Sequence, residues 1–251
     1  MIGSKQQLQK LSPCHVSVGS VDIFPVRKAC KLGVWCDSQL SMSKSCGAAF
    51  YWLYNIKCIS KFLSKENLIS VIHAFVTSRL DYCNSILYGL PSSELIELQR
   101  VQNAAARLVT STQRYCHITP ILYELHWLPV KFRINFKLLL TTFKALYGMA
   151  PNYIADLLNI RKKDKYSLRS NDSIMLEYPK ENILGDRSFS VAATKLWNEL
   201  PEDIRNISSI NVFKIALKTH LLNQLSVSSS IIACNFISVN MLYVNFMLHI
   251  L

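Results

Sequence analysis

Apolar positions between residues 64 and 110 recur every three to four residues, the spacing of amphipathic helices. Ser64 stands before the first stripe as a candidate N-cap, and Gly89 and Pro91 interrupt the pattern where the chain must turn. Ser92 or Ser93 is then expected to cap the second helix. The two stripes are Leu68, Ile69, Ile72, Phe75, Val76 and Leu80, and then Leu95, Leu98, Val101, Ala105, Leu108 and Val109. We expect two helices packed along these stripes.

The same spacing predicts helices over residues 44–60, 130–147, 188–200 and 210–223, with short ones near 119–125 and 151–158. The expected core residues of the first are Ala48, Tyr51, Trp52 and Ile59, and those of the second are Phe132, Phe136, Leu139, Leu140, Phe143 and Tyr147. The last two helices are expected to bury Phe189, Ala192, Ala193, Leu196 and Trp197, and Phe213, Ile215, Leu217 and Leu221. Opposite the core side of 130–147 runs a polar stripe of Arg133, Lys137, Thr141 and Lys144.

Strand patterns are short and lie mostly near the N-terminus. His15 to Phe24 alternates between apolar and polar residues, Pro25 interrupts it, and Lys31 to Cys36 is a second candidate. We expect these two strands to pair as one antiparallel hairpin, and 174–178 to form a further strand. The predicted fold class is mainly α, a helical bundle with a small N-terminal antiparallel β-hairpin. The expected regions are a hairpin at 1–40, helices at 41–110, a second helical region at 111–224 and an apolar tail at 225–251.

The charge balance points to an anionic partner. The chain of 251 residues has a net charge of +12, which favours nucleic acid or an anionic membrane surface. Its eight cysteines form no CxxC pair, so the sequence predicts reduced thiols and no zinc site or other cofactor. The first residues lack the apolar core of a secretory signal. We therefore expect an intracellular protein that is not secreted; its oligomeric state is left open.

The C-terminal residues 231–251 contain no Lys, Arg, Asp or Glu. They number about 20, near the length that spans a bilayer as a helix. Asn235, Asn240 and Asn245 would spread around such a helix rather than form one polar face. Three interpretations stay open: a membrane anchor, a buried helix or strand, and translated flanking sequence.

Long strings of this sequence resemble the C-terminal part of reverse transcriptases encoded by retrotransposons without long terminal repeats, of the jockey-like and chicken-repeat-like groups. The strings are SRLDYCNSILYGLP, LQRVQNAAARLV, HITPILYELHWLPVKFRINFKLLLTTFKALYGMAPNYI, GDRSFSVAATKLWNELPEDIR and FKIALKTHL. Upstream, KLGVWCDSQLSM is similar to the strand and turn that lead from the polymerase palm to the thumb. The resemblance covers residues 18 to 222 and implies a thumb-like helical bundle with the region beyond it.

The paired aspartates of the palm are missing from this chain. Polymerases of the family hold two metal ions with an aromatic–Ala–Asp–Asp turn, and this sequence has no Asp–Asp pair. We therefore expect a non-catalytic fragment, not an enzyme, that binds RNA or DNA backbone weakly and without sequence preference. The expected contact residues are Lys57, Lys61, Arg100, Arg107, Arg133, Lys137 and Lys144, with Lys162 and Lys163 as outer contacts. Tyr115 and Trp127 are candidates for base stacking, although core or connector roles are expected for both. The alternative is a vestigial or membrane-anchored protein without a selected activity.

Overall fold

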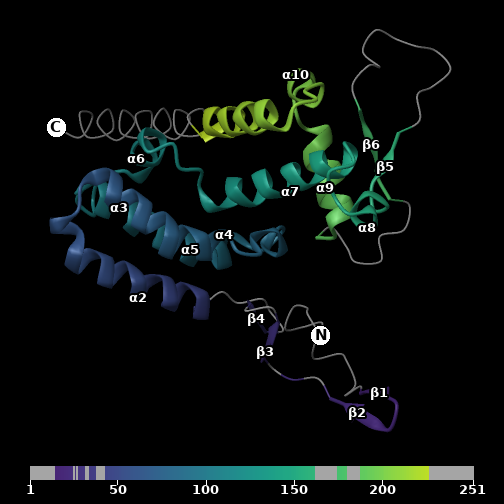
Figure 1. Cartoon of the computed structure of the whole chain (residues 1–251), viewed down its shortest axis with the longest axis horizontal. Helices are drawn as coiled ribbons and strands as arrows, with labels where there is room; N and C mark the ends of the chain where they lie inside the picture. Colours follow the sequence, from purple (N-terminus) through teal and green to yellow (C-terminus); the bar gives the residue numbers. More distant parts are fainter. Residues whose placement is uncertain are drawn as a thin grey trace, which may run out of the picture. The chain divides into compact units, whose positions relative to one another are not determined.

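The computed structural model describes residues 15–24, 26, 28–31, 34–37, 43–161, 174–179 and 187–225 (Figure 1). The fold is mainly helical, with small antiparallel β-sheets near the N-terminus, and the sequence predicts this fold class. The chain forms two compact units, Met1–Ser111 and Thr112–Leu251.

Two short hairpins stand where the sequence predicts one. Strand β1 (Val16–Val18) pairs with β2 (Val21–Ile23), and β3 (Lys28–Lys31) pairs with β4 (Val34–Asp37). The predicted strand from His15 to Phe24 is therefore itself a hairpin. Gly19 has a positive φ of 63°, which glycine adopts without the steric cost of a Cβ, and it turns the chain between β1 and β2.

The helices of the first unit are α2 (Ser43–Ile59), the 3-10 turn η1 (Ser60–Phe62), α3 (Lys65–Ile72), the π-helical turn η2 (His73–Thr77), α4 (Ser78–Asp81), the 3-10 turn η3 (Asn84–Leu87) and α5 (Ser92–Thr110). The Ser64 hydroxyl accepts a hydrogen bond from the Asn67 amide, as predicted for an N-cap. The predicted Ser92 or Ser93 cap is wrong, because α5 starts after Pro91 without a side-chain cap. Pro91 itself fits there, since a helix start has amide groups without helical partners.

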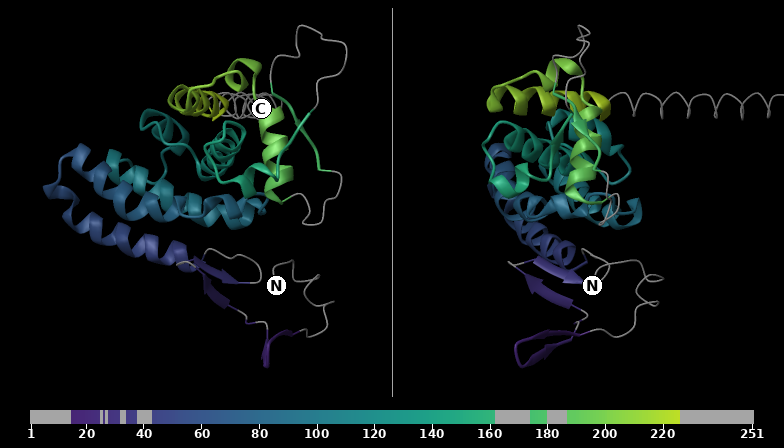
Figure 2. Two further views of the ribbon diagram at one scale, coloured as in Figure 1. Left: turned by 45° about the vertical axis from the view of Figure 1, so that its right-hand side comes forward. Right: turned by 90° about the vertical axis from the view of Figure 1, so that its right-hand side faces the viewer.

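The core of the first unit lies where α2 packs along α3 and α5 (Figure 2). The buried side chains are Cys46, Ala49, Leu53, Ile56, Leu68, Ile72, Val76, Leu80, Leu98, Val101, Ala105, Ala106 and Val109. The two stripes predicted for 64–110 supply most of this core. The predicted core of α2 is wrong, because Tyr51 is 63% exposed and Ile59 is also exposed. Helix α2 is rotated so that Cys46, Ala49, Leu53 and Ile56 face inward.

The second unit contains α6 (Ile118–Glu124), α7 (Val130–Leu146), α8 (Asn152–Ala155), strands β5 (Asn159–Ile160) and β6 (Leu176–Glu177), α9 (Phe189–Asn198), α10 (Glu202–Arg205) and a helix at 210–225. Helix α7 contacts α8 and α9. The rings of Phe143 on α7 and Phe213 stack with their centroids 4.3 Å apart. Trp197, Phe143 and Phe213 are fully buried, so an aromatic cluster forms the centre of this core.

Core assignments on α7, on α9 and on the helix at 210–225 differ from the prediction, and one strand was not predicted. On α9, Phe189 is half-buried rather than buried. On α7 the buried residues are Val130, Ile134, Leu138, Leu139, Thr142, Phe143 and Ala145, whereas Phe132, Phe136, Leu140 and Tyr147 are only half-buried. Ile215 is exposed rather than buried. The predicted strand at 174–178 contains β6, and it pairs antiparallel with β5, a strand that the pattern did not indicate.

Candidate nucleic-acid interface

Lys57 and Lys61 lie at the end of α2 and in η1, and both are exposed. The Lys61 ammonium lies 5.0 Å from the centroid of the Phe62 ring, a cation–π distance. Residues 38–65 contain no Asp or Glu, so no acidic side chain from this stretch offsets the two lysines. Both cations therefore lie at the surface, as a contact to phosphate requires.

Aromatic side chains surround these lysines. Tyr51, Tyr54 and Phe62 are 63%, 68% and 79% exposed. On the flank of α2, Tyr51 meets Trp52 edge to face at 6.0 Å, and Trp52 stacks on Phe75 of η2 at 4.9 Å. The Arg79 guanidinium lies 5.4 Å from the Trp52 ring. An aromatic surface that also carries cations is therefore present on the first unit.

Arg100 and Arg107 lie on α5 and differ in their surroundings. Arg100 is exposed, whereas Arg107 is half-buried with its Nε shielded from solvent. Arg107 also lies in the last turn of α5, where a cation is stabilised by the partial negative charge of the helix end. Arg100 is positioned for an outward contact, and Arg107 has a structural role that the sequence pattern does not indicate.

Helix α7 holds the cationic stripe predicted to face away from the core. Lys137 is exposed, but Arg133 and Lys144 are half-buried. The Arg133 Nε donates a 2.8 Å hydrogen bond to the Leu128 carbonyl, in the connector before α7. Arg133 therefore braces the start of its own helix. Of the three cations in the stripe, Lys137 is therefore the exposed one, and Lys144 is partly accessible.

The two candidates for base stacking, Trp127 and Tyr115, differ in their exposure to solvent. Trp127 is buried, so it serves as a core residue of the connector. Tyr115 is 84% exposed, next to exposed Arg114 and His117, and its ring is accessible to a planar ligand. Lys162 and Lys163 lie outside the described residues.

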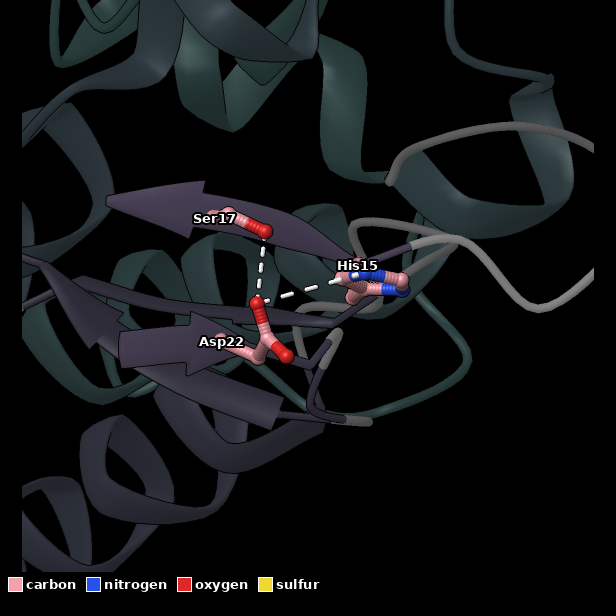
Figure 3. Close-up of polar contacts among 3 residues, drawn as sticks. All are labelled: His15, Ser17 and Asp22. Atoms are coloured by element: carbon pink, nitrogen blue, oxygen red, sulfur yellow. Dashed lines mark hydrogen bonds and ion pairs between the residues drawn. The ribbon is translucent and has the colours of Figure 1, made fainter. Parts of the chain in front are cut away.

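A polar cluster on the first hairpin, in Figure 3, contains the three residue types of a hydrolase triad but not its arrangement. Ser17 Oγ donates to Asp22 Oδ1 at 2.5 Å, and His15 Nε2 lies 4.0 Å from the same oxygen. A catalytic triad instead places the imidazole between the hydroxyl and the carboxylate. All three side chains are exposed, and the cluster serves to join the strands of the hairpin.

Cys46 is a buried thiol on α2. Burial and, to a smaller extent, the nearby Glu97 carboxylate together raise the pKa of the Cys46 thiol to about 11. This thiol is therefore protonated near neutral pH and is a poor nucleophile and metal ligand. Among the residues with described positions, no group of His, Cys, Asp and Glu is arranged to hold a metal ion.

None of the described helices combines the length and apolar character needed to cross a bilayer. The candidate anchor at 231–251 lies outside the described residues.

Comparison with known proteins identifies no relative of this chain. No protein-family model, curated protein or solved structure matches this chain.

Proposed function

We propose that this chain is a non-catalytic fragment of a retrotransposon reverse transcriptase that retains weak, sequence-independent binding to a nucleic-acid backbone. The resemblance of five long strings supports the family. The observation that carries the binding is α7, which contains Lys131, Arg133, Lys137 and Lys144 and no acidic residue. A rigid helix that carries several cations and no acid of its own can follow phosphates without reading bases.

Lys137 and Lys144 are the pair best placed for phosphate. They are seven residues apart, which is about two helical turns, so they lie on one side of α7. The fully buried residues Leu139 and Phe143 anchor other sides of the helix. The helix is thereby held in the core, while Lys137 is exposed and Lys144 is partly accessible.

The double variant Lys137→Gln/Lys144→Gln is expected to reduce the salt dependence of duplex binding. Each neutralised phosphate contributes a slope of about −0.9 in log affinity against log salt, so two lost contacts flatten the slope by up to about 1.8. Binding is measured by fluorescence anisotropy over a salt series, with DNA duplex and RNA–DNA hybrid. Lys137 is exposed and Lys144 is half-buried, and Gln keeps a polar side chain at both positions, so the variant should fold.

The matched control is Lys195→Gln/Lys218→Gln, which removes two exposed cations of the same unit that lie on other helices. Arg133 is left unchanged because its bond to Leu128 supports the helix start. Equal slopes for the α7 variant and the unaltered chain would show that the stripe is only a solvated face. A chain that binds neither duplex nor hybrid would favour the vestigial alternative.

The purified chain is expected to extend no primer. The expected reason is that its sequence has no Asp–Asp pair to hold the two metal ions that nucleotidyl transfer uses. The assay contains RNA or DNA template with annealed primer, nucleotides and magnesium, and it compares the product with a reaction without protein. Template-dependent extension above that background would refute the non-catalytic part of the proposal.

A further inference from the structure

The outward side of α2 is aromatic and cationic. We define the outer face of α2 as Phe50, Tyr51, Tyr54, Lys57 and Cys58, with Lys61 and Phe62 of η1, and every one of these side chains is exposed. The members on α2 recur at intervals of three and four, the period of one helix face. The aliphatic residues Leu53 and Ile56 point to the core instead. The face is thus distinct from the packing side of the helix.

The chemistry of this face suits a polyanion that presents flat apolar groups. Lys57 and Lys61 lie about 7 Å apart along the axis, from the rise of an α-helix followed by a 3-10 turn. Tyr54 lies one turn before Lys57, and Phe62 follows Lys61. Two cations therefore lie between two accessible rings along this stretch of chain. Residues 38–65 carry no acid that would repel phosphate.

We propose that the outer face of α2 binds single-stranded nucleic acid, with Tyr54 and Phe62 stacking on bases and Lys57 and Lys61 contacting phosphates. Nucleic acid as the class of ligand rests on the function proposed above. Single strands fit because their bases present π-faces to aromatic side chains, whereas a duplex stacks its bases on one another. The site therefore differs from α7, which offers cations for any backbone.

An anionic membrane is the competing partner for an aromatic and basic helix. Helices that lie in the membrane interface place their lysines on the polar face, opposite the apolar one. Here Lys57 and Lys61 lie on the same side as Tyr54. The aliphatic residues Leu53 and Ile56, which would enter the acyl layer, face the protein core, and the exposed Ile59 is only the last residue of the helix. The arrangement thus favours nucleic acid.

The test uses the full chain and three labelled ligands of about 20 nucleotides. This length exceeds the roughly 4–16 nucleotides that one single-strand-binding domain covers. They are oligothymidylate, an abasic strand with the same backbone, and a duplex. Stacking predicts that oligothymidylate binds at least about fivefold more tightly than the abasic strand. This comparison needs no variant, so it does not depend on the folding of one.

The variant Tyr54→Ala/Phe62→Ala is expected to weaken oligothymidylate binding by about 5- to 150-fold for each stacked base. Its binding to the abasic strand and to duplex should stay unchanged. The control Tyr153→Ala removes an equally exposed ring from α8, where Tyr153 is 70% exposed, and should bind all three ligands as the unaltered chain does. Lys57→Gln/Lys61→Gln should flatten the single-strand salt slope by up to about 1.4.

Three results would overturn the site. One is equal affinity for oligothymidylate and the abasic strand, and another is unchanged oligothymidylate binding by the aromatic variant. The third is binding to phosphatidylserine vesicles that needs Tyr54 and Phe62, without binding to oligothymidylate. If duplex binding that depends on Lys137 and Lys144 persists in these cases, the function proposed for the chain stands and only the α2 site fails. If no nucleic acid binds at all, both proposals fail.

Discussion

Trp197→Ala is expected to lower the free energy of unfolding of the second unit by about 3–5 kcal/mol, the usual cost of truncating a buried aromatic residue. Trp197 is fully buried on α9, with its ring centroid 6.0 Å from that of Phe213. Phe213 in turn stacks on Phe143 of α7. The indole Nε1 also donates a 2.8 Å hydrogen bond to the Ile174 carbonyl. The substitution therefore leaves a cavity and removes a tie between α9 and the segment before β6.

Urea unfolding of the full chain, followed by circular dichroism, measures this loss. Trp197→Phe keeps an aromatic ring but loses the indole donor, so it should cost less than Trp197→Ala. Phe189→Ala provides a second comparison on the same helix, because Phe189 is only half-buried and should also cost less. An unchanged unfolding midpoint for Trp197→Ala would mean that α9 does not pack in the observed orientation.

The register of α9 could be predicted because its sequence allows one buried side. Ala192, Ala193, Leu196 and Trp197 fall together at helical spacing, and all four are buried as predicted. Exposed Lys195 and Glu199 mark the opposite side of the helix. Small residues beside one large ring leave little choice of packing face.

The registers of α2 and α7 could not be predicted in this way, because both helices have apolar residues on most of their sides. On α7, Lys131 and Lys137 are the only exposed residues between Val130 and Leu146. A helix that is apolar on most sides is buried on most sides, so periodicity does not choose among the possible faces. On α2 the sequence predicts Tyr51 and Trp52 in the core, yet Tyr51 is exposed and Trp52 is half-buried.

The strands could not be predicted fully either, because they are too short for their periodicity to be read. Alternation over residues 15–24 fits one strand and two short strands equally well. The chain forms two strands here because it turns at Gly19, where φ is positive. Strand β5 has two residues, Asn159 and Ile160, and it is paired with a segment distant in sequence. Such a pair is too short to produce a period.

For the candidate interface, the sequence indicated where cations lie but not what else they contact. Arg133 and Lys137 are equivalent in the pattern, since both lie opposite the predicted core. The structure separates them because the Arg133 guanidinium reaches the Leu128 carbonyl, one turn before its own position. A side chain that binds the backbone of a neighbouring turn leaves no periodic signal.

Asn198 is a structural residue of this kind, and its removal is the second large effect that we expect. Its amide Nδ2 donates to the Leu176 carbonyl at 2.9 Å, and its Oδ1 accepts from the Leu176 amide at 3.0 Å. The Asn198 side chain thus pairs with β6 as a neighbouring strand would. Leu176 is itself buried, so both of its backbone groups depend on this partner.

Asn198→Ala is expected to destabilise the second unit by about 1–3 kcal/mol for each backbone group that stays buried without a partner. Asn198→Asp separates the two bonds: its carboxylate can still accept from the Leu176 amide, but its second oxygen repels the Leu176 carbonyl, so stability also falls while the amide bond is kept. Urea unfolding gives the stability, and hydrogen exchange of the Leu176 amide reports on the bond itself. Exchange at Leu176 should quicken in Asn198→Ala, while exchange at Phe143 in the centre of α7 follows the global stability. If Leu176 keeps its full protection in Asn198→Ala, β5 alone holds β6 in place, and the side-chain pairing does not anchor the strand to α9.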